Sequence, residues 1–189
     1  MLPDTAVRRA RGALARAVRF VTSPGAEWEA VRAEHPPVVR VLWQHLVPLS
    51  LLPAAGWAAG SAMAGRPGSI WVGGVATFLL CLASVVLHAS ALNAVLPMYG
   101  CRRDWGRACV VSSYAATPLL AVGVFLVLPA LMVMALITLP FALYLAHDGV
   151  QHLLGVQQAD AAEFVAVTAT VFVIASMAAG AVLGGSGLI

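Results

Sequence analysis

One group of polar residues in this sequence has the spacing of a chemical site. Tyr144, Asp148 and His152 follow one another at intervals of four residues, and His147 lies beside them. Residues four apart share one face of an α-helix, so a carboxylate and imidazoles would meet there. Such a group could move a proton or bind a divalent cation. The alternative, which we favour, is ordinary polarity at the end of a membrane span, so we expect no bound metal.

Two further polar residues, His88 and Asn93, lie inside one long apolar run. Polar groups at membrane depth are candidates for function. A neutral imidazole or amide can also serve only as a hydrogen-bonding contact between helices. Both interpretations stay open for His88 and Asn93.

A third group, Ser113, Thr117 and Pro118, predicts a kink in a helix. Pro118 has no amide hydrogen and therefore frees the carbonyl of Tyr114, four residues earlier. The hydroxyl groups of Ser113 and Thr117 could bond nearby carbonyls and stabilise the bend. A broken helix can also form a transporter binding site, but a packed structural kink is the interpretation we favour.

The helices that must position these residues are predicted from the distribution of charge. Eleven of the nineteen charged residues lie in the first forty positions, and the uncharged runs that follow are 41–65, 67–101, 108–147 and 164–189. A crossing helix needs about 20 mostly apolar residues, so the third run can hold two crossings and each of the others one. The sequence predicts an all-α, polytopic transmembrane helical bundle of about five spans, with an N-terminal amphipathic interfacial segment.

Composition supports a membrane protein. The sequence is 61% hydrophobic, with a mean hydropathy of +0.90, whereas soluble domains are roughly 45–50% apolar. The net charge of +3 is too small to indicate nucleic-acid binding. We expect two parts, a basic cytoplasmic segment at 1–37 and a membrane domain at 38–189.

The predicted partners of the 1–37 segment are the lipid bilayer and its anionic headgroups. Residues 5–21 combine an apolar helical stripe with arginines on the other face, a pattern typical of the membrane surface. Trp28, in a second amphipathic stretch, is interpreted as an interfacial anchor. A solvated basic tail that only sets topology is the alternative for the first stretch.

Arginine asymmetry predicts the orientation. Placing the N-terminus in the cytoplasm leaves only Arg66 outside, and five spans would then put the C-terminus on the periplasmic or extracellular side of a bacterial inner membrane. The turn between the third and fourth spans is expected near Pro129, with Gly123 or Pro140 as alternatives. Gly56 and Gly60 form a small-residue step that would let another helix approach closely.

Several motifs in order resemble one family. They are P-x-x-E-W-E-x-V from Pro24, with Trp28 at its centre, Y-x-x-T-P from Tyr114 to Pro118, and the run from Phe141 to Val150 with Tyr144 and Gly149. Together they resemble the Yip1 domain family of integral membrane proteins, in its bacterial branch. Phe141 replaces a frequent tyrosine, His147 and Asp148 replace apolar residues, and Gly100-Cys101 replaces a double glycine.

The resemblance implies a five-span membrane protein without evident catalysis that organises membrane or partner proteins. Eukaryotic members work in vesicle trafficking and contact Rab-type GTPases. The alternative is a small transporter or channel that uses polar groups in kinked spans. The sequence carries none of the common hydrolase, metalloprotease or phosphate-binding motifs. We therefore expect no enzyme and no cofactor, and a membrane-protein partner or a homo-oligomer.

Overall fold

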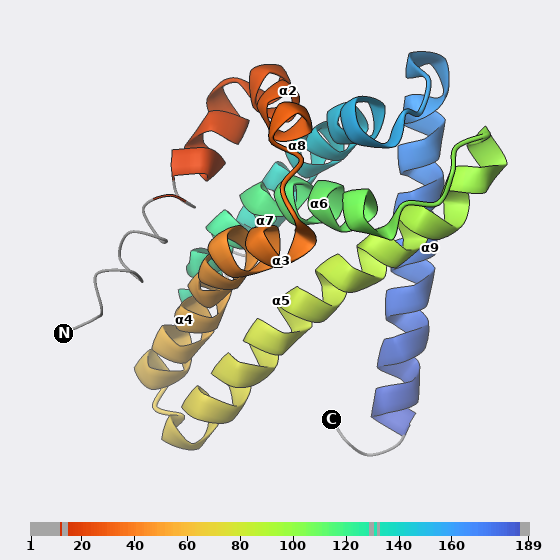
Figure 1. Cartoon of the computed structure of the whole chain (residues 1–189). Helices are drawn as coiled ribbons and strands as arrows, with labels where there is room; N and C mark the ends of the chain where they lie inside the picture. The colour runs from red at the N-terminus through yellow and green to blue at the C-terminus, as the bar shows by residue number, and fades with distance from the viewer. Residues whose placement is uncertain (1–11, 13–14, 129–130, 132, 186–189) are drawn as a thin grey trace.

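The structure is a computed structural model that describes residues 12, 15–128, 131 and 133–185, and this part of the chain is helical with no strand (Figure 1). Its longer helices are α2 (Pro24–Glu34), α4 (Val47–Met63), α5 (Pro67–Val95), α6 (Trp105–Ala115), α8 (Val133–Gly149) and α9 (Gln158–Gly185). Its shorter elements are α3 (Val38–Val41), α7 (Thr117–Val122), the π-helical turns η1 (Leu42–Leu46) and η5 (Val150–Leu154), and the 3-10 turns η2 (Leu96–Tyr99) and η3 (Gly123–Val127). The predicted all-α fold is confirmed.

Three helices are long and apolar enough to cross a membrane, namely Val38–Met63, Ile70–Tyr99 and Gln158–Ala175. A fourth span is present if the bent pair Trp105–Ala115 and Thr117–Val127 counts as one crossing. Helix α8 has 17 residues and is not among these candidates. The described chain thus has three or four candidate spans where the sequence predicts about five.

The predicted kink before Pro118 is confirmed. Helices α6 and α7 meet at Ala116 with a bend of 41°. The Ser113 hydroxyl donates to the carbonyl of Cys109 at 2.7 Å, as expected for a hydroxyl that bonds its own helix. The sequence predicts the same for Thr117, but the Thr117 hydroxyl instead contacts the side chain of His45 on η1.

The glycine step of α4 packs against the backbone of η3. A Cβ atom added to Gly56 would lie 2.6 Å from the carbonyl oxygen of Val124, and one added to Gly60 would lie 2.7 Å from that of Val127. The predicted close approach is therefore confirmed, with the 3-10 turn η3 as the partner. Gly123 lies equally close to Pro53. The predicted turn at Pro129 lies outside the described residues.

Gly60→Ala tests this approach. Because the opposing atoms are backbone oxygens that cannot rotate away, we expect a loss of about 1–3 kcal/mol in the free energy of unfolding, typical of overpacking. Gly68→Ala is the matched control, since a Cβ atom there meets nothing within 4 Å. Thermal unfolding in detergent followed by circular dichroism measures both. Equal stability of the two variants would contradict the packing.

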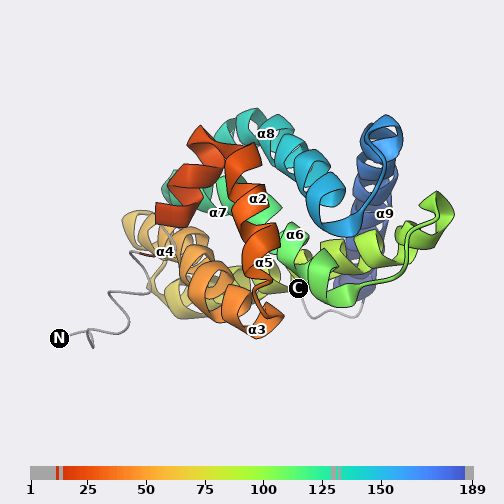
Figure 2. The same ribbon diagram turned by 45° about the horizontal axis from the view of Figure 1, so that its top comes forward.

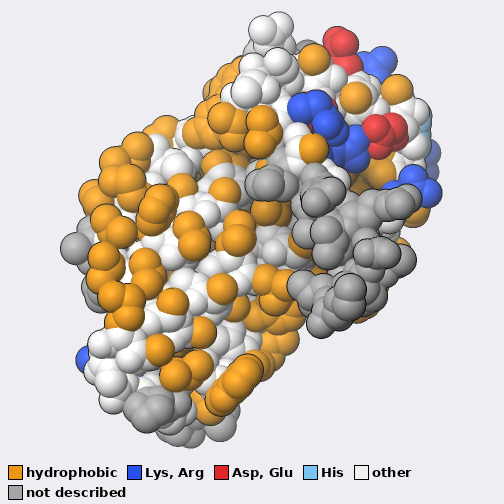
Figure 3. Space-filling view, turned by 90° about the vertical axis from the view of Figure 1, so that its left-hand side faces the viewer, with side chains coloured by type: hydrophobic (Ala, Val, Ile, Leu, Met, Phe, Trp, Pro, Cys, Tyr) orange, Lys and Arg blue, Asp and Glu red, His pale blue; other side chains and the backbone are white. Residues whose placement is uncertain are grey.

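Charged and aromatic residues mark the two ends of the bundle. Figure 3 shows one face on which hydrophobic side chains cover most of the surface and charged side chains gather at one end. Trp43 and Trp105 are 61% and 46% exposed at this end, and Trp57 and Trp71 are 42% and 80% exposed nearer the opposite turn. Exposed tryptophans at both ends are typical of the two membrane–water interfaces.

Helix α2 lies across the charged end of the bundle, next to α8 and η5 (Figure 2). Helix α9 begins at that end and finishes near the level of the α4–α5 turn, at the other (Figure 1). The described N-terminal and C-terminal helices therefore reach opposite ends of the bundle. The placement of the two termini relative to the cell stays a prediction.

Candidate functional site

The site centres on Trp28, which is not at the membrane surface. Its side chain is 0% exposed and belongs to the same core as Phe20 and Tyr114. The prediction that Trp28 is an interfacial anchor is wrong, because its amphipathic helix α2 turns the indole toward the bundle instead of lipid. Val18 and Val21, in helical residues 15–22, are exposed, so contact of this segment with lipid headgroups stays a prediction.

Trp28 rests directly on Gly149 near the end of α8. A Cβ atom at position 149 would lie 2.6 Å from Cζ2 of the indole ring. Only a residue without a side chain allows the indole to approach this closely. Two motif residues separated by more than a hundred positions in sequence are thus explained by one contact.

An aromatic cluster joins this contact to the kinked helix. The ring centroids of Phe20 and Trp28 are 4.9 Å apart, as are those of Phe20 and Tyr114. Trp28 and Tyr114 meet edge to face at 6.0 Å, and His45 packs on Tyr114 at 4.6 Å. Offset and edge-to-face pairs are favourable arrangements of aromatic rings. The cluster attaches residues 15–34, which we call the docked N-terminal segment, to α6.

A network of charges covers the cluster. Arg16 Nε donates to Glu27 Oε1 at 2.6 Å, and Arg16 Nη2 donates to Glu34 at 2.6 Å. Arg19 Nε donates to the other oxygen of Glu27 at 2.7 Å. Arg16 also donates to the hydroxyl of Tyr114 at 3.1 Å, with its guanidinium 5.5 Å from that ring.

The network keeps Glu27 ionised although its residue is only 5% exposed. Burial alone would raise the pKa of this carboxyl, but hydrogen bonds from Arg19 and Arg16 outweigh burial and lower the pKa overall. Burial would likewise lower the pKa of Arg16, and bonds to Glu34 and Glu27 raise it instead. Both partners therefore stay charged, and the pair holds α2 against residues 15–22.

The polar contacts continue into the bundle through His45, on the π-helical turn η1. Its Nε2 lies 2.9 Å from the hydroxyl of Thr117, and both residues are buried. Within the described residues, His45 Nδ1 has no hydrogen-bond partner. π-Helical turns are frequent at functional sites. The described structure thus brings Trp28, Tyr114, Thr117 and Gly149 together, and buries Pro118 in the adjoining turn.

The other predicted residues lie apart from this site. Tyr144 is 50% exposed and stacks on Phe141. Asn93 has a buried Oδ1 atom without a hydrogen-bond partner in the part of the chain described. His88 Nδ1 lies 3.0 Å from the hydroxyl of Ser112, which donates its one proton to the carbonyl of Val85. His88 must therefore donate to Ser112, which makes it a contact between α5 and α6.

The cluster near His147 does not form a metal site. Asp148 lies 3.4 Å from His152, and His147 instead contacts Gln151. Among the described residues, no group of three or more acidic, histidine or cysteine side chains could hold a metal ion.

Sequence reasoning missed six members of the site, namely Arg16, Arg19, Phe20, Glu27, Glu34 and His45. Glu27 stands in the P-x-x-E-W motif, which is the one local signal that could have found it. Nothing in the sequence marks Phe20 or Arg16, because their partner Tyr114 lies more than ninety residues away.

The helical bundle, its apolar candidate spans and its exposed tryptophans define an integral membrane protein. The family model described as "Yip1 domain" matches residues 18–181, so the chain belongs to the Yip1 domain family. The match begins inside the segment that carries Phe20 and Trp28. No curated protein and no solved structure shows significant similarity to the chain.

Proposed function

We propose that this Yip1-domain membrane protein is non-catalytic and organises partner membrane proteins, with its docked N-terminal segment as the part that responds to or holds a partner. One observation carries the proposal. Arg16 bonds Glu27 and donates to the hydroxyl of Tyr114 in the kinked helix, and Phe20 and Trp28 lie in the core with Tyr114, so the segment and the bundle share one core. A partner that binds the segment would therefore act directly on the arrangement of the helices.

The surface of α5 supports the same proposal. Only 6% of the residues in the most apolar stretch of the span Ile70–Tyr99 are buried within the chain. Val72 and Leu80 of this helix are 73% and 64% exposed. The exposed face of this helix is therefore free for lipid or for the helices of another protein.

Photo-crosslinking in native membranes tests the proposal. A photoreactive amino acid at position 80 should give discrete protein adducts, either with a second copy or with another membrane protein, identified by mass spectrometry. Glu27→Gln should weaken these adducts while the protein still inserts, and Glu29→Gln, an exposed change in the same helix, should leave them unchanged. Lipid adducts alone, or equal adducts in all variants, would contradict the organising function.

A transporter or channel is the second candidate function. It is favoured by the 41° break between α6 and α7, at which buried His45 and Thr117 face each other. Discontinuous helices can form substrate sites near the middle of the membrane. Uptake or conductance in proteoliposomes that is abolished by His45→Ala, His88→Ala or Asn93→Ala would establish this function and displace the first.

A further inference from the structure

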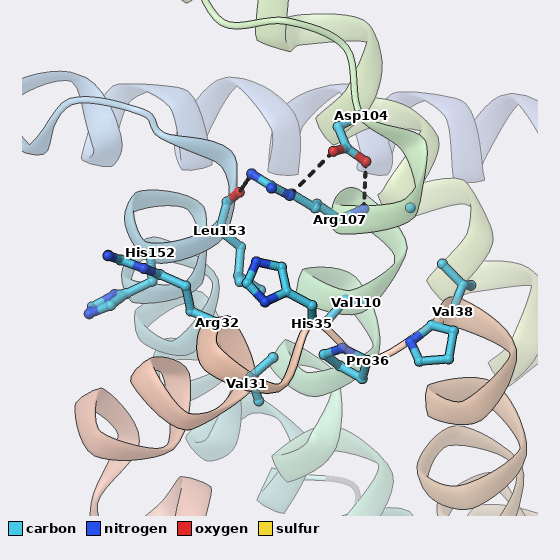
Figure 4. A pocket seen from close by; sticks show the side chains of 12 residues that line it. Val31, Arg32, His35, Pro36, Val38, Asp104, Arg107, Val110, His152 and Leu153 are labelled. Carbon is cyan, nitrogen blue, oxygen red and sulfur yellow. Dashed lines mark hydrogen bonds and ion pairs between the residues drawn. The ribbon is translucent and has the colours of Figure 1, made fainter.

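A second polar site lies at the charged end of the bundle, beside the last turn of α2. It is a pocket of about 610 Å³ between the end of α2, the start of α6 and the π-helical turn η5 (Figure 4). This volume lies within the range of about 300–1,000 Å³ found for small-molecule sites. Neither the motifs nor the docked segment accounts for it.

Two arginines and two histidines line the pocket, namely Arg32, Arg107, His35 and His152. Figure 4 shows Arg32 and His152 at one edge, His35 in the middle and Arg107 bound to Asp104. The one acidic residue of the lining, Asp104, accepts from the backbone amide of Arg107 at 2.9 Å and lies 3.3 Å from its Nε. The negative charge of Asp104 is therefore balanced by Arg107, and the positive charge of Arg32 has no acidic partner among the residues that line the pocket.

Donors remain for a ligand on each of these side chains. Arg32 forms no hydrogen bond or ion pair with any described residue. Arg107 Nε lies 3.3 Å from Asp104 in an ion pair, and Nη1 donates to the carbonyl of Leu153 at 3.2 Å, which leaves the N–H groups of Nη2 and one of Nη1. His35 and His152 each donate through Nδ1 to a backbone carbonyl, at 3.2 Å and 2.8 Å, so Nε2 of each ring donates to an anion when the imidazole is in its protonated form.

The end of α2 sets the position of one of these residues. His35 is the C-cap of α2, with φ of 44°, and its backbone amide donates to the carbonyl of Val31. A left-handed residue is a common way for a helix to end. Pro36 and Pro37 follow it and fix the loop that forms one wall of the pocket.

The position of the pocket indicates which anion it meets. Pro37 and Val38 line it, and Val38 is the first residue of the first candidate span. The exposed indole of Trp43 lies on the same span, little more than a helical turn away, where aromatic residues meet lipid headgroups. Phosphate is the anion of this layer, and arginine binds it through several N–H groups at once.

We propose that the pocket binds a phosphate group through Arg32, Arg107 and the Nε2 atoms of His35 and His152. The group belongs either to an anionic phospholipid headgroup or to a soluble phosphate ester. This assignment does not rest on the proposed organising function, because it concerns a separate site.

Native mass spectrometry of the whole protein in detergent tests the assignment. The probes are dioctanoyl phosphatidic acid, dioctanoyl phosphatidylcholine and glycerol 3-phosphate. We expect phosphatidic acid to bind the wild type and to bind Arg32→Gln about tenfold less tightly, as the loss of a charge-assisted contact implies. Arg103→Gln is the matched control, since Arg103 carries the same charge and is also exposed, next to Asp104 in sequence, but does not line the pocket.

The results distinguish the two sources. Binding of phosphatidic acid alone, weakened by Arg32→Gln only, supports a lipid headgroup, and similar behaviour of glycerol 3-phosphate supports a soluble ester. Equal weakening in Arg103→Gln would reveal general surface attraction and overturn the proposal. Equal binding of phosphatidylcholine, or no binding of any probe, would also overturn the proposal. Arg32 is exposed, so its replacement leaves the fold intact.

Discussion

Trp28→Ala should release the N-terminal segment from the bundle. Removing a fully buried tryptophan costs about 3–5 kcal/mol, and here it also empties the contact with Gly149 and the edge-to-face contacts with Phe20 and Tyr114. Hydrogen exchange measured by mass spectrometry follows the release. Because 1.4 kcal/mol is a factor of ten, exchange of the amides in 24–34 should accelerate by about 100-fold or more.

Trp43→Ala is the matched control for this prediction. It removes the same side chain from a site that is 61% exposed, outside the core. Exchange in 24–34 should stay at the wild-type rate in this variant. If both alanine variants exchange alike, Trp28 does not hold the segment in place.

Glu27→Gln should have the second largest effect. It leaves Arg19 without its carboxylate, and leaves Arg16 with only Glu34 and Tyr114. Breaking a fully buried ion pair costs about 3–5 kcal/mol, and the part-exposed Arg16 reduces this to about 2–3 kcal/mol. The same exchange measurement on 24–34 should show a loss of protection smaller than that of Trp28→Ala.

Acid should act like the Glu27→Gln substitution. The pKa of Glu27 is lowered in the folded protein, so its contribution is complete above the ordinary value of 4.5 and disappears as the pH falls through the lower folded value. We expect the stability of the docked segment to be level from pH 7 to 5 and to fall below about 4.5. In Glu27→Gln this fall should be smaller. Glu29→Gln, which alters an exposed carboxyl, should keep the wild-type profile.

The spans and the kink could be predicted from sequence because their causes are local. Long uncharged runs mark the candidate spans, and Pro118 marks the bend between α6 and α7. The close approach at Gly56 and Gly60 was also predictable, since small residues one turn apart permit it. The partner in that approach is the 3-10 turn η3 and not a regular helix. This could not be predicted, because the sequence of α4 carries no sign of how η3 folds.

The arrangement of the site could not be predicted in the same way. An amphipathic helix has one pattern whether its apolar face meets lipid or protein, so the sequence of α2 did not distinguish a surface anchor from a core residue at Trp28. The distinguishing contact, Gly149, lies on another helix. Thr117 likewise reaches His45 across the bundle instead of a carbonyl of its own helix, because η1 brings the imidazole within 2.9 Å.

Disulfide trapping between α2 and α8 measures the docking of the N-terminal segment most directly. Asp148 Oδ2 lies 3.9 Å from a Cβ atom placed on Gly25, so Gly25→Cys with Asp148→Cys should form an intramolecular disulfide in high yield in a background without the native cysteines. Glu29→Cys with Asp148→Cys is the control pair on the same two helices. The docked arrangement predicts the joined peptide in the first pair and little in the second. A segment that lies on the lipid surface away from α8 would give the disulfide in neither pair, and that result would contradict the structure described above.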